Sequence, residues 1–183
     1  MGTPRPRAWS LLSILEPQHG GNEGYDDNTA THYSYDSTVS NHRYVSKGDL
    51  AVIRDGTQLL GVGIISSITC SKGMKKRLRC PECRKTGFKP RTTKLPVFRC
   101  DRGHTFDTPT EEMISVDKYR ADYGETWTPL RNILSAEALE EFIPSAARMH
   151  SIREVDVQRL RATLGRSVPD RIWKMISDVE SNS

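Results

Sequence analysis

Short apolar runs separated by polar turns predict β-strands in the first two thirds of the chain. Residues 8–17, AWSLLSILEP, predict a first strand. Residues 50–54 and 59–68 predict two further strands, and Asp55-Gly56 between them is typical of a turn. Residues 113–130 begin as a strand and then become irregular. These runs together predict a small β-barrel or a curled sheet.

Residues 18–42 interrupt this pattern. They are rich in Gly, Asn, Asp, Ser, Thr, Tyr and His and contain few aliphatic residues. Loops of this length in a compact domain are usually functional or disordered. We therefore expect a long loop here, and we treat it as a candidate functional segment.

The last third of the chain has a helical pattern. Ser135 can cap a helix that runs through Phe142. Residues 151–154, SIRE, match a capping box that would open a second helix, and Gly165 can end it. A last amphipathic helix begins after Val168-Pro169 and places four apolar side chains on one side: Ile172, Trp173, Ile176 and Val179.

The predicted fold class is therefore α+β. Residues 1–130 would form the small β-barrel, with an insertion at about 77–107, and residues 131–183 would form a C-terminal helical segment. Gly61 and Gly63 lie within a predicted strand and are interpreted as packing or bend glycines. The chain of 183 residues is long enough for one domain with an appendage.

The insertion contains two pairs of candidate metal ligands separated by sixteen residues. The ligands are Cys80, Cys83, Cys100 and His104. Paired ligands two or three residues apart can reach one tetrahedral Zn²⁺ from a single turn, so the spacing predicts a zinc ribbon. Four ligands would close the shell, which favours structural rather than catalytic zinc, and Glu82 is expected to face solvent. A chance cluster of thiols is the alternative, Asp101 is a weaker fourth ligand, and Cys70 is expected to be buried in a strand.

The net charge of +4 hides an uneven distribution. Residues 72–99 hold eleven Lys or Arg and one acid, whereas the rest of the chain holds sixteen bases and twenty-two acids. A local basic patch of this kind suits a polyanion. Eight side chains are predicted to contact phosphates: Arg77, Arg79, Arg84, Lys85, Lys89, Arg91, Lys94 and Arg99. The alternative is that these charges only keep the ribbon soluble.

Residues 24–44 hold four of the six tyrosines. Tyr33, Tyr35 and Asp36 stand together; aromatic faces can sandwich a nucleobase, and a carboxylate can accept from a cytosine amine. Trp127 is a further stacking candidate. The alternative is that both tyrosines point to one face of a strand and pack into the core, and that Trp127 is also core.

No catalytic set is complete. His32 and His42 lack the surroundings of an HNH nuclease, and the sequence has no G-x-S-x-G motif or phosphate-cradling glycine loop. No window approaches eighteen apolar residues and the start lacks a small-residue cleavage site, so we expect a cytoplasmic, nucleoid-associated protein with no membrane span. In that compartment the four cysteines would be metal ligands or free thiols.

Residues 24–68 resemble the N-terminal reader domains of some actinobacterial modification-dependent HNH restriction endonucleases, which belong to the PUA-like superfamily with EVE, ASCH, YTH and SRA domains. The resemblance rests on the strand pair around Gly48-Asp49-Leu50 and residues 60–63, LGVG, and on a zinc ribbon followed by FDTP at 106–109. It covers residues 8–130.

The resemblance implies a reader of modified DNA, with 5-methylcytosine in duplex DNA as the favoured target. Because the chain has no HNH domain, we expect a non-catalytic protein. The base would be flipped into a pocket in which Tyr33, Tyr35 and Trp127 stack and Asp36 reads its Watson–Crick edge. The basic ribbon would hold the backbone. Those endonucleases carry an HNH domain where this chain has helices, so cleavage would come from a nuclease partner or would not occur.

Three other functions stay open from the sequence. The same superfamily contains RNA binders, so a reader of modified RNA is one alternative. A metal-dependent nuclease that uses His32 or His42 is a second. The third is a protein-interaction adaptor in which the C-terminal helices carry the function. The oligomeric state is not predicted.

Overall fold

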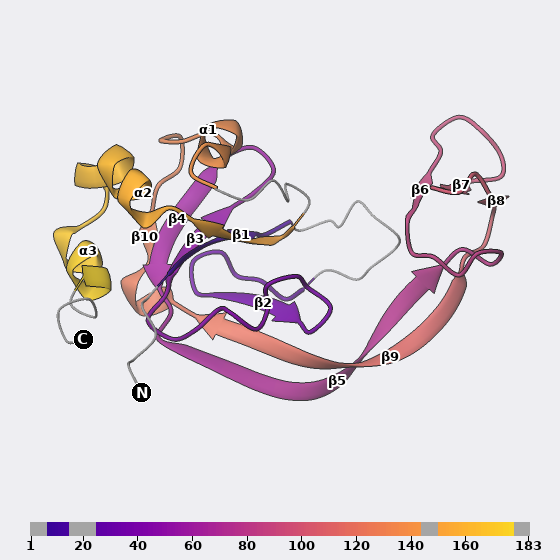
Figure 1. Cartoon of the computed structure of the whole chain (residues 1–183), viewed down its shortest axis with the longest axis horizontal. Helices are drawn as coiled ribbons and strands as arrows, with labels where there is room; N and C mark the ends of the chain where they lie inside the picture. Colours follow the sequence, from indigo (N-terminus) through magenta and orange to yellow (C-terminus); the bar gives the residue numbers. More distant parts are fainter. Residues whose placement is uncertain (1–6, 15–24, 144–149, 178–183) are drawn as a thin grey trace. The chain divides into compact units, whose positions relative to one another are not determined.

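The protein is described by a computed structural model that covers residues 7–14, 25–143 and 150–177 (Figure 1). The fold is mixed α+β, with short helices and mostly sheet, as predicted. The described chain divides into two compact units: residues 7–14, 26–71, 118–143 and 150–177 form the first, and residues 25 and 72–117 form the second. Two long strands, β5 (Ser67–Arg79) and β9 (Thr110–Asp122), contribute residues to both units.

A five-stranded sheet forms the centre of the first unit. Its strands in spatial order are β10 (Thr128–Pro129), β4 (Leu59–Ile64), β3 (Leu50–Arg54), β1 (Ala8–Leu12) and β11 (Ile152–Val155). β1 and β3 are parallel, and the other pairs are antiparallel. The sheet has two open edges, so the strands of the described residues do not close into the expected barrel.

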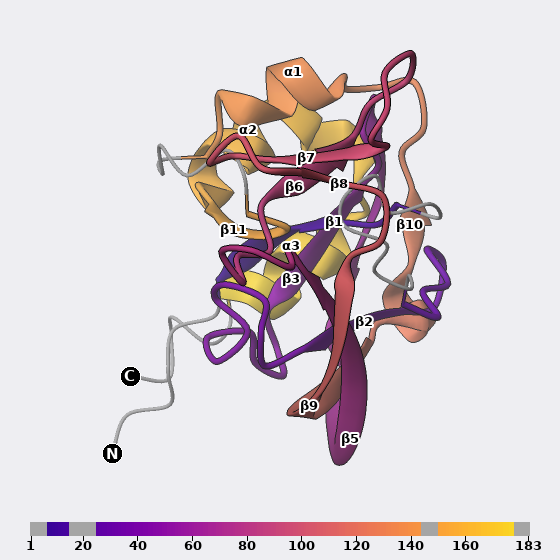
Figure 2. The ribbon, with the colours of Figure 1, turned by 90° about the vertical axis from the view of Figure 1, so that its right-hand side faces the viewer.

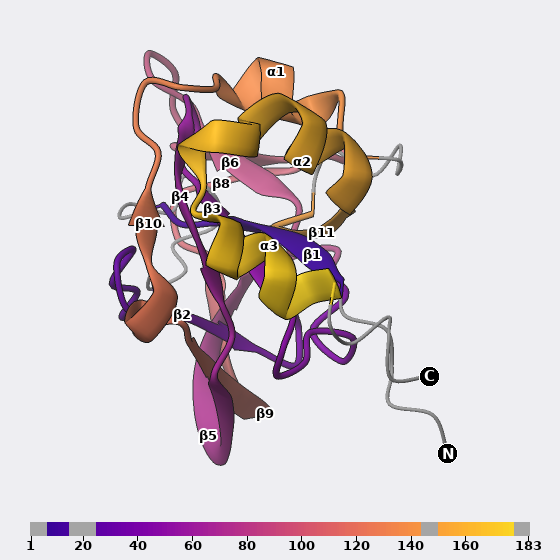
Figure 3. The ribbon, with the colours of Figure 1, turned by 90° about the vertical axis from the view of Figure 1, so that its left-hand side faces the viewer.

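Alternating side chains bury both faces of this sheet. In β3, Leu50 and Val52 belong to one core cluster, whereas Ala51 and Ile53 belong to the other. This alternation follows from the two-residue period of a strand. The first cluster is completed by helices α1 (Ala136–Glu140), α2 (Val157–Leu164) and α3 (Asp170–Ser177), and Figure 3 shows α2 and α3 over one face of the strands.

The opposite face is covered by part of a second sheet, with the strand order β2-β9-β5. Strand β2 (His32–Asp36) pairs antiparallel with the end of β9, so that Tyr35 lies opposite Tyr119. β2 lies inside the segment expected to be a long loop. This five-residue strand is buried throughout, but it was not predicted because the residues around it are mostly polar.

The second unit contains a small three-stranded ribbon. Strands β6 (Phe88–Pro90), β7 (Phe98–Cys100) and β8 (Thr105–Phe106) are antiparallel neighbours, and Figure 2 looks onto them. Their shared core contains the three phenylalanine rings, which pack edge-to-face or stacked with centroids 5.2–5.7 Å apart.

The C-terminal helices pack within the first unit. Leu139, Leu160 and Ile172 pack with residues of β1, β3 and β4 in one cluster. Arg153 on β11 is buried, and its guanidinium donates to the Glu140 carboxylate of α1 (Nη1 to Oε2, 2.6 Å). The chain between residues 131 and 177 therefore completes the fold of the strands that precede it.

Two of the three helix starts were predicted well. The Ser135 side chain accepts from the Ala138 N–H and caps α1, and α3 begins at Asp170, with Ile172, Trp173 and Ile176 buried. Val179, Leu15–Pro17 and the first part of the expected loop lie outside the described residues.

The predicted capping box at 151–154 is wrong. Residues Ile152–Val155 form β11, which pairs with β1, and Asp156 instead caps α2 by accepting from the N–H groups of Gln158 and Arg159. Pairing with the edge of β1 and burial of Ile152 and Val155 stabilise a strand here more than the local capping motif stabilises a helix. Gly165 does end α2.

Gly61 is required by close packing, as predicted. A Cβ atom at this position would lie 2.5 Å from the Trp127 ring and from the Thr128 backbone oxygen. At Gly63 a Cβ would lie 3.0 Å from the Tyr123 backbone oxygen. The two glycines let the segment after β9 approach β4 closely.

No helix in the described part of the chain is long and apolar enough to cross a membrane.

Asp49 fixes the start of the central strands. Its buried carboxylate accepts from the Arg7 N–H (2.9 Å), the Trp9 indole N–H (2.8 Å) and the Ser46 N–H (2.8 Å). It therefore ties β1 to the turn before β3.

Asp49→Ala is expected to lower the free energy of unfolding by about 3 kcal/mol, because three donors lose a charged acceptor in a buried site. Urea unfolding followed by tryptophan fluorescence reports this, since all three tryptophans lie in the first unit. Glu125→Gln, at an exposed carboxylate, is the control and should change stability by less than about 0.5 kcal/mol. Equal effects of the two substitutions would show that Asp49 is not an anchor.

Candidate metal centre and basic ribbon

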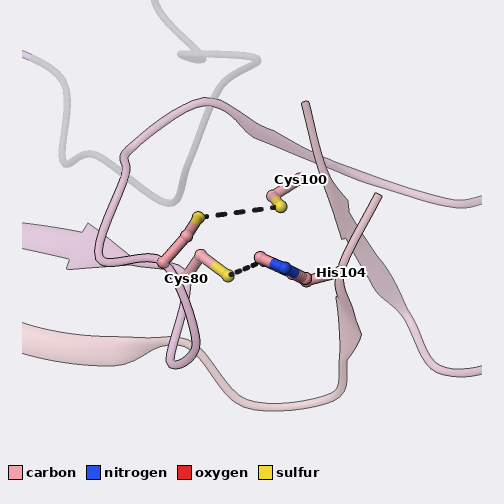
Figure 4. Close-up of side chains that lie close together, drawn as sticks. Cys80, Cys100 and His104 are labelled. Carbon is pink, nitrogen blue, oxygen red and sulfur yellow. Dashed lines mark hydrogen bonds between the residues drawn. The ribbon is translucent and has the colours of Figure 1, made fainter. Parts of the chain in front are cut away.

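The four predicted ligands meet in the second unit. The side-chain atoms of Cys80, Cys83, Cys100 and His104 all lie within 4.8 Å of one another. The Cys80 Sγ lies 3.7 Å from His104 Nδ1, and the Cys83 Sγ lies 3.9 Å from the Cys100 Sγ (Figure 4). Zn–S bonds of about 2.3 Å place tetrahedral ligands about 3.8 Å apart, so the cluster fits Zn²⁺.

Each ligand pair lies in a tight turn, and the turn directs both ligand side chains towards the same position. In the first turn the Arg84 N–H donates to the Cys80 oxygen (2.9 Å), and Arg84 has φ 61°. In the second, the Gly103 N–H donates to the Cys100 oxygen (2.9 Å), and Gly103 has φ 92°. Such left-handed residues let the chain turn back towards the ion. The one-residue difference in spacing is thus accommodated by two similar turns.

The surroundings favour a bound cation. Burial acts to raise the pKa of the Cys80 thiol, but hydrogen bonds from the Cys83 and Glu82 backbone bring it below its ordinary value. The Glu82 carboxylate lies 3.7 Å from His104 Nε2, the ring nitrogen that faces away from Cys80. At this distance the carboxylate forms no hydrogen bond with the ring, but a small movement of its exposed side chain would let it accept from Nε2 and orient the imidazole. Glu82 was expected only to face solvent, and the sequence offered no signal of this contact.

Asp101 is not part of the cluster, and within the described residues no second group of potential metal ligands was found. Four protein ligands leave no open coordination position for a substrate. The arrangement can therefore hold Zn²⁺ as a structural ion that joins the two turns.

The eight predicted phosphate contacts differ in exposure and in their bonds within the fold. Arg79 forms an ion pair with Glu112, lowering the pKa of that carboxyl, and donates to the Arg84 oxygen (2.8 Å). The Arg91 guanidinium donates to the Pro96 oxygen from Nε (2.9 Å) and from Nη2 (2.5 Å). These two arginines hold the ribbon together. Arg77 is half-buried, and five side chains are exposed: Arg84, Lys85, Lys89, Lys94 and Arg99.

Lys89 and Arg99 stand directly opposite each other across the β6–β7 pair. Their neighbours Phe88, Phe98 and Cys100 point into the ribbon core, so the two charges share the outer face. Neither side chain forms an ion pair with any residue that the structure describes. Like charges directly opposite in a sheet destabilise it, and a bound anion would relieve this repulsion.

The predicted base-pocket residues lie in the first unit and are mostly buried. Tyr33, Tyr35 and Asp36 are 2%, 1% and 1% exposed, and burial raises the pKa of both tyrosine hydroxyls. The Tyr35 ring stacks between Tyr33 and Tyr119, with centroids 5.8 and 5.1 Å away. The alternative of core packing therefore describes both tyrosines in this conformation.

Asp36 and Trp127 also have local structural roles. The Asp36 carboxylate accepts from the Thr38 N–H (2.8 Å) and hydroxyl (2.5 Å), which stabilises the turn after β2. Trp127 is half-buried, and its ring covers Gly61. A base could reach the Asp36 carboxylate only if side chains of the first unit moved.

The histidines considered for catalysis are bonded within the fold. His32 contacts the Asp26 oxygen through Nε2 (2.7 Å) and the Thr31 hydroxyl through Nδ1 (2.9 Å). His42 Nδ1 lies 2.8 Å from the Val39 oxygen. Cys70 lies in β5 as expected, but it is exposed rather than buried, so that part of the prediction is wrong.

A scan against protein-family models gave no match, and neither did searches of curated proteins and of solved structures.

The metal centre gives a direct prediction. The wild-type chain should bind one zinc ion, and Cys100→Ser should lose most of it, because the serine hydroxyl is a poor ligand at this position. Elemental analysis measures the metal, and amide NMR should show loss of dispersion for residues 72–117 while resonances of the first unit persist. Cys70→Ser is the matched control and should keep full zinc content. Full metal content in Cys100→Ser would contradict the site.

Proposed function

We propose that the protein binds duplex DNA through the basic outer face of its zinc ribbon, without cutting it. The observation that carries this proposal is the Lys89–Arg99 pair, two cations held opposite each other with no described acidic partner. Residues 72–117 contain twelve Lys or Arg and six Asp or Glu, so this part of the second unit favours an anion. Backbone phosphates supply closely spaced negative charges of the required kind.

We further propose that the bound DNA is modified, with 5-methylcytosine as the leading candidate. This part rests on the resemblance of residues 24–68 to PUA-like reader domains. In this proposal the ribbon supplies affinity that is independent of sequence, and the first unit reads the base. Since Tyr33 and Tyr35 are buried, reading by these rings requires β2 or its neighbours to open. The protein would then work at the nucleoid, alone or as the targeting subunit of a nuclease.

Replacing both Lys89 and Arg99 with Ala tests the ribbon. Affinity for duplex DNA should fall, and the slope of log K against log salt should become shallower by about 2, since each lost phosphate contact removes about 0.9. Zinc content should be unchanged and stability should not decrease, because the substitution also removes a like-charge repulsion. Fluorescence anisotropy at several salt concentrations gives both quantities.

The matched control for this variant is Arg171→Ala with Lys174→Ala. It removes one arginine and one lysine, both exposed, from α3 of the first unit. Its salt slope should equal that of the wild type. If both double variants lost the same amount of DNA affinity, the effect would come from net charge and not from the ribbon. If the wild type did not bind DNA, the proposal would be wrong.

Methylation is tested separately with matched duplexes, unmodified and methylated at cytosine, at moderate salt. We expect the methylated duplex to bind roughly fourfold more tightly, the gain for burying one methyl group of about 0.8 kcal/mol. Equal binding would remove the reader function while leaving the ribbon's role intact. A single-stranded RNA that competes better than either duplex would point to RNA instead.

A further inference from the structure

The loop between β6 and β7 presents an unusual apolar residue. Leu95 is 82% exposed, the highest value among the exposed large hydrophobic residues of the described chain. It is followed by Pro96 and then Val97, which is 36% exposed. Exposed leucine is unfavourable in water unless a partner covers it. A single exposed apolar residue is common on surfaces, so its setting decides whether it has a role.

The loop is built to hold this residue in place. The Arg91 N–H donates to the Val97 oxygen (2.6 Å), and the Arg91 guanidinium donates twice to the Pro96 oxygen. From the other side, the Val97 N–H donates to the Asp107 carboxylate (2.9 Å). These bonds close the loop on both sides of Leu95 and Pro96. The apolar tip is therefore pre-organised, which lowers the entropic cost of inserting it into a partner.

Three basic residues lie close to the tip along the chain. Lys94 precedes Leu95 and is exposed, and the Lys89–Arg99 pair lies on the strands that the loop connects. The ribbon thus combines one highly exposed leucine with exposed cations on the same loop and on the two strands that it connects. Proteins that bend DNA use this combination, because basic side chains hold the phosphates while an apolar side chain enters between two base pairs.

We propose that Leu95 is a wedge that inserts between base steps of the duplex held by the ribbon, locally unstacking it. This inference rests on the proposed DNA-binding function and adds to it the way in which the duplex is deformed. Unstacking a step costs free energy, and burial of the leucine between the bases offsets it. Pyrimidine–purine steps such as TA unstack most easily, whereas A-tracts are stiff. Leu95 would therefore give a preference for deformable sequences without reading any base edge.

The test uses the full-length protein and duplexes that carry 2-aminopurine, whose fluorescence rises when it is unstacked. One duplex has repeated TA steps with 2-aminopurine in place of adenine, and the other has an A-tract. Wild-type protein should raise the fluorescence of the TA duplex well above that of the A-tract. Leu95→Ala should abolish the rise while affinity falls by less than roughly tenfold, since the phosphate contacts remain.

Two variants control for trivial effects. Leu95→Met keeps an apolar wedge and should keep the signal. Ile133→Ala removes a similar apolar group, 48% exposed, from the first unit and should behave as the wild type. Zinc content verifies that the ribbon of each variant is folded.

The outcomes separate the two proposals. If the wild type does not bind either duplex, the DNA-binding function fails. If it binds both but the fluorescence is unchanged, or if Leu95→Ala retains the full rise, only the wedge is overturned. A basic apolar tip can also bind an anionic membrane. Loss of binding to phosphatidylserine vesicles by Leu95→Ala, with an unchanged 2-aminopurine signal, would therefore also overturn the wedge.

Discussion

A metal ion held by Cys80, Cys83, Cys100 and His104 would be the constraint on which the second unit depends. The apolar core of this unit is one small group of residues built around three phenylalanine rings, and two of the cysteines are part of it. A core of this size contributes too little to fix a ribbon of short strands, so small domains of this kind rely on a metal. One ion bound by two turns would join the end of β5 to the end of β7, and this fixes the register of everything between them.

That rigidity explains how the ribbon tolerates its own charge. Lys89 and Arg99 repel each other across a strand pair of three residues each. Without a strong constraint nearby, the repulsion would favour separation of the strands. Cys100 follows Arg99 directly and Phe88 precedes Lys89, so the aromatic core holds the backbone at both charged positions, and a metal ion on Cys100 would restrain it further. Arg79 and Arg91, in contrast, use their charges within the fold. The eight basic side chains therefore divide by position, and residue type alone could not separate the structural arginines from those free to bind an anion.

The sequence predicted the features that depend on neighbouring residues. Ligand spacing identified the metal cluster, and an apolar run with a turn identified β3 and β4. It failed where distant parts of the chain decide. Ile152–Val155 has a capping motif but becomes a strand, because it pairs with β1 more than 140 residues away in sequence, Ala8 lying opposite Val155. Tyr33 and Tyr35 lie in a polar segment that is typical of a loop, yet pairing with β9 and contact with the central sheet bury them. Burial of Cys70 was predicted wrongly, because the side-chain alternation of a single strand does not indicate which of its faces the rest of the chain covers.

The burial of Tyr35 also restricts how base reading could work. Its ring lies in a stack with Tyr33 and Tyr119, yet its hydroxyl has no hydrogen-bond partner in the described structure. Exposure of this hydroxyl to water would therefore break no hydrogen bond of the described structure. Access to it would still require the loss of stacking and of apolar burial, a cost that must be met before any base is bound. Phosphate contacts do not depend on that opening, so on the proposed function the ribbon must bind first and supply the free energy. Recognition of a base would then be a second step, and its contribution to affinity would be the gain from the modified base minus the cost of opening this stack.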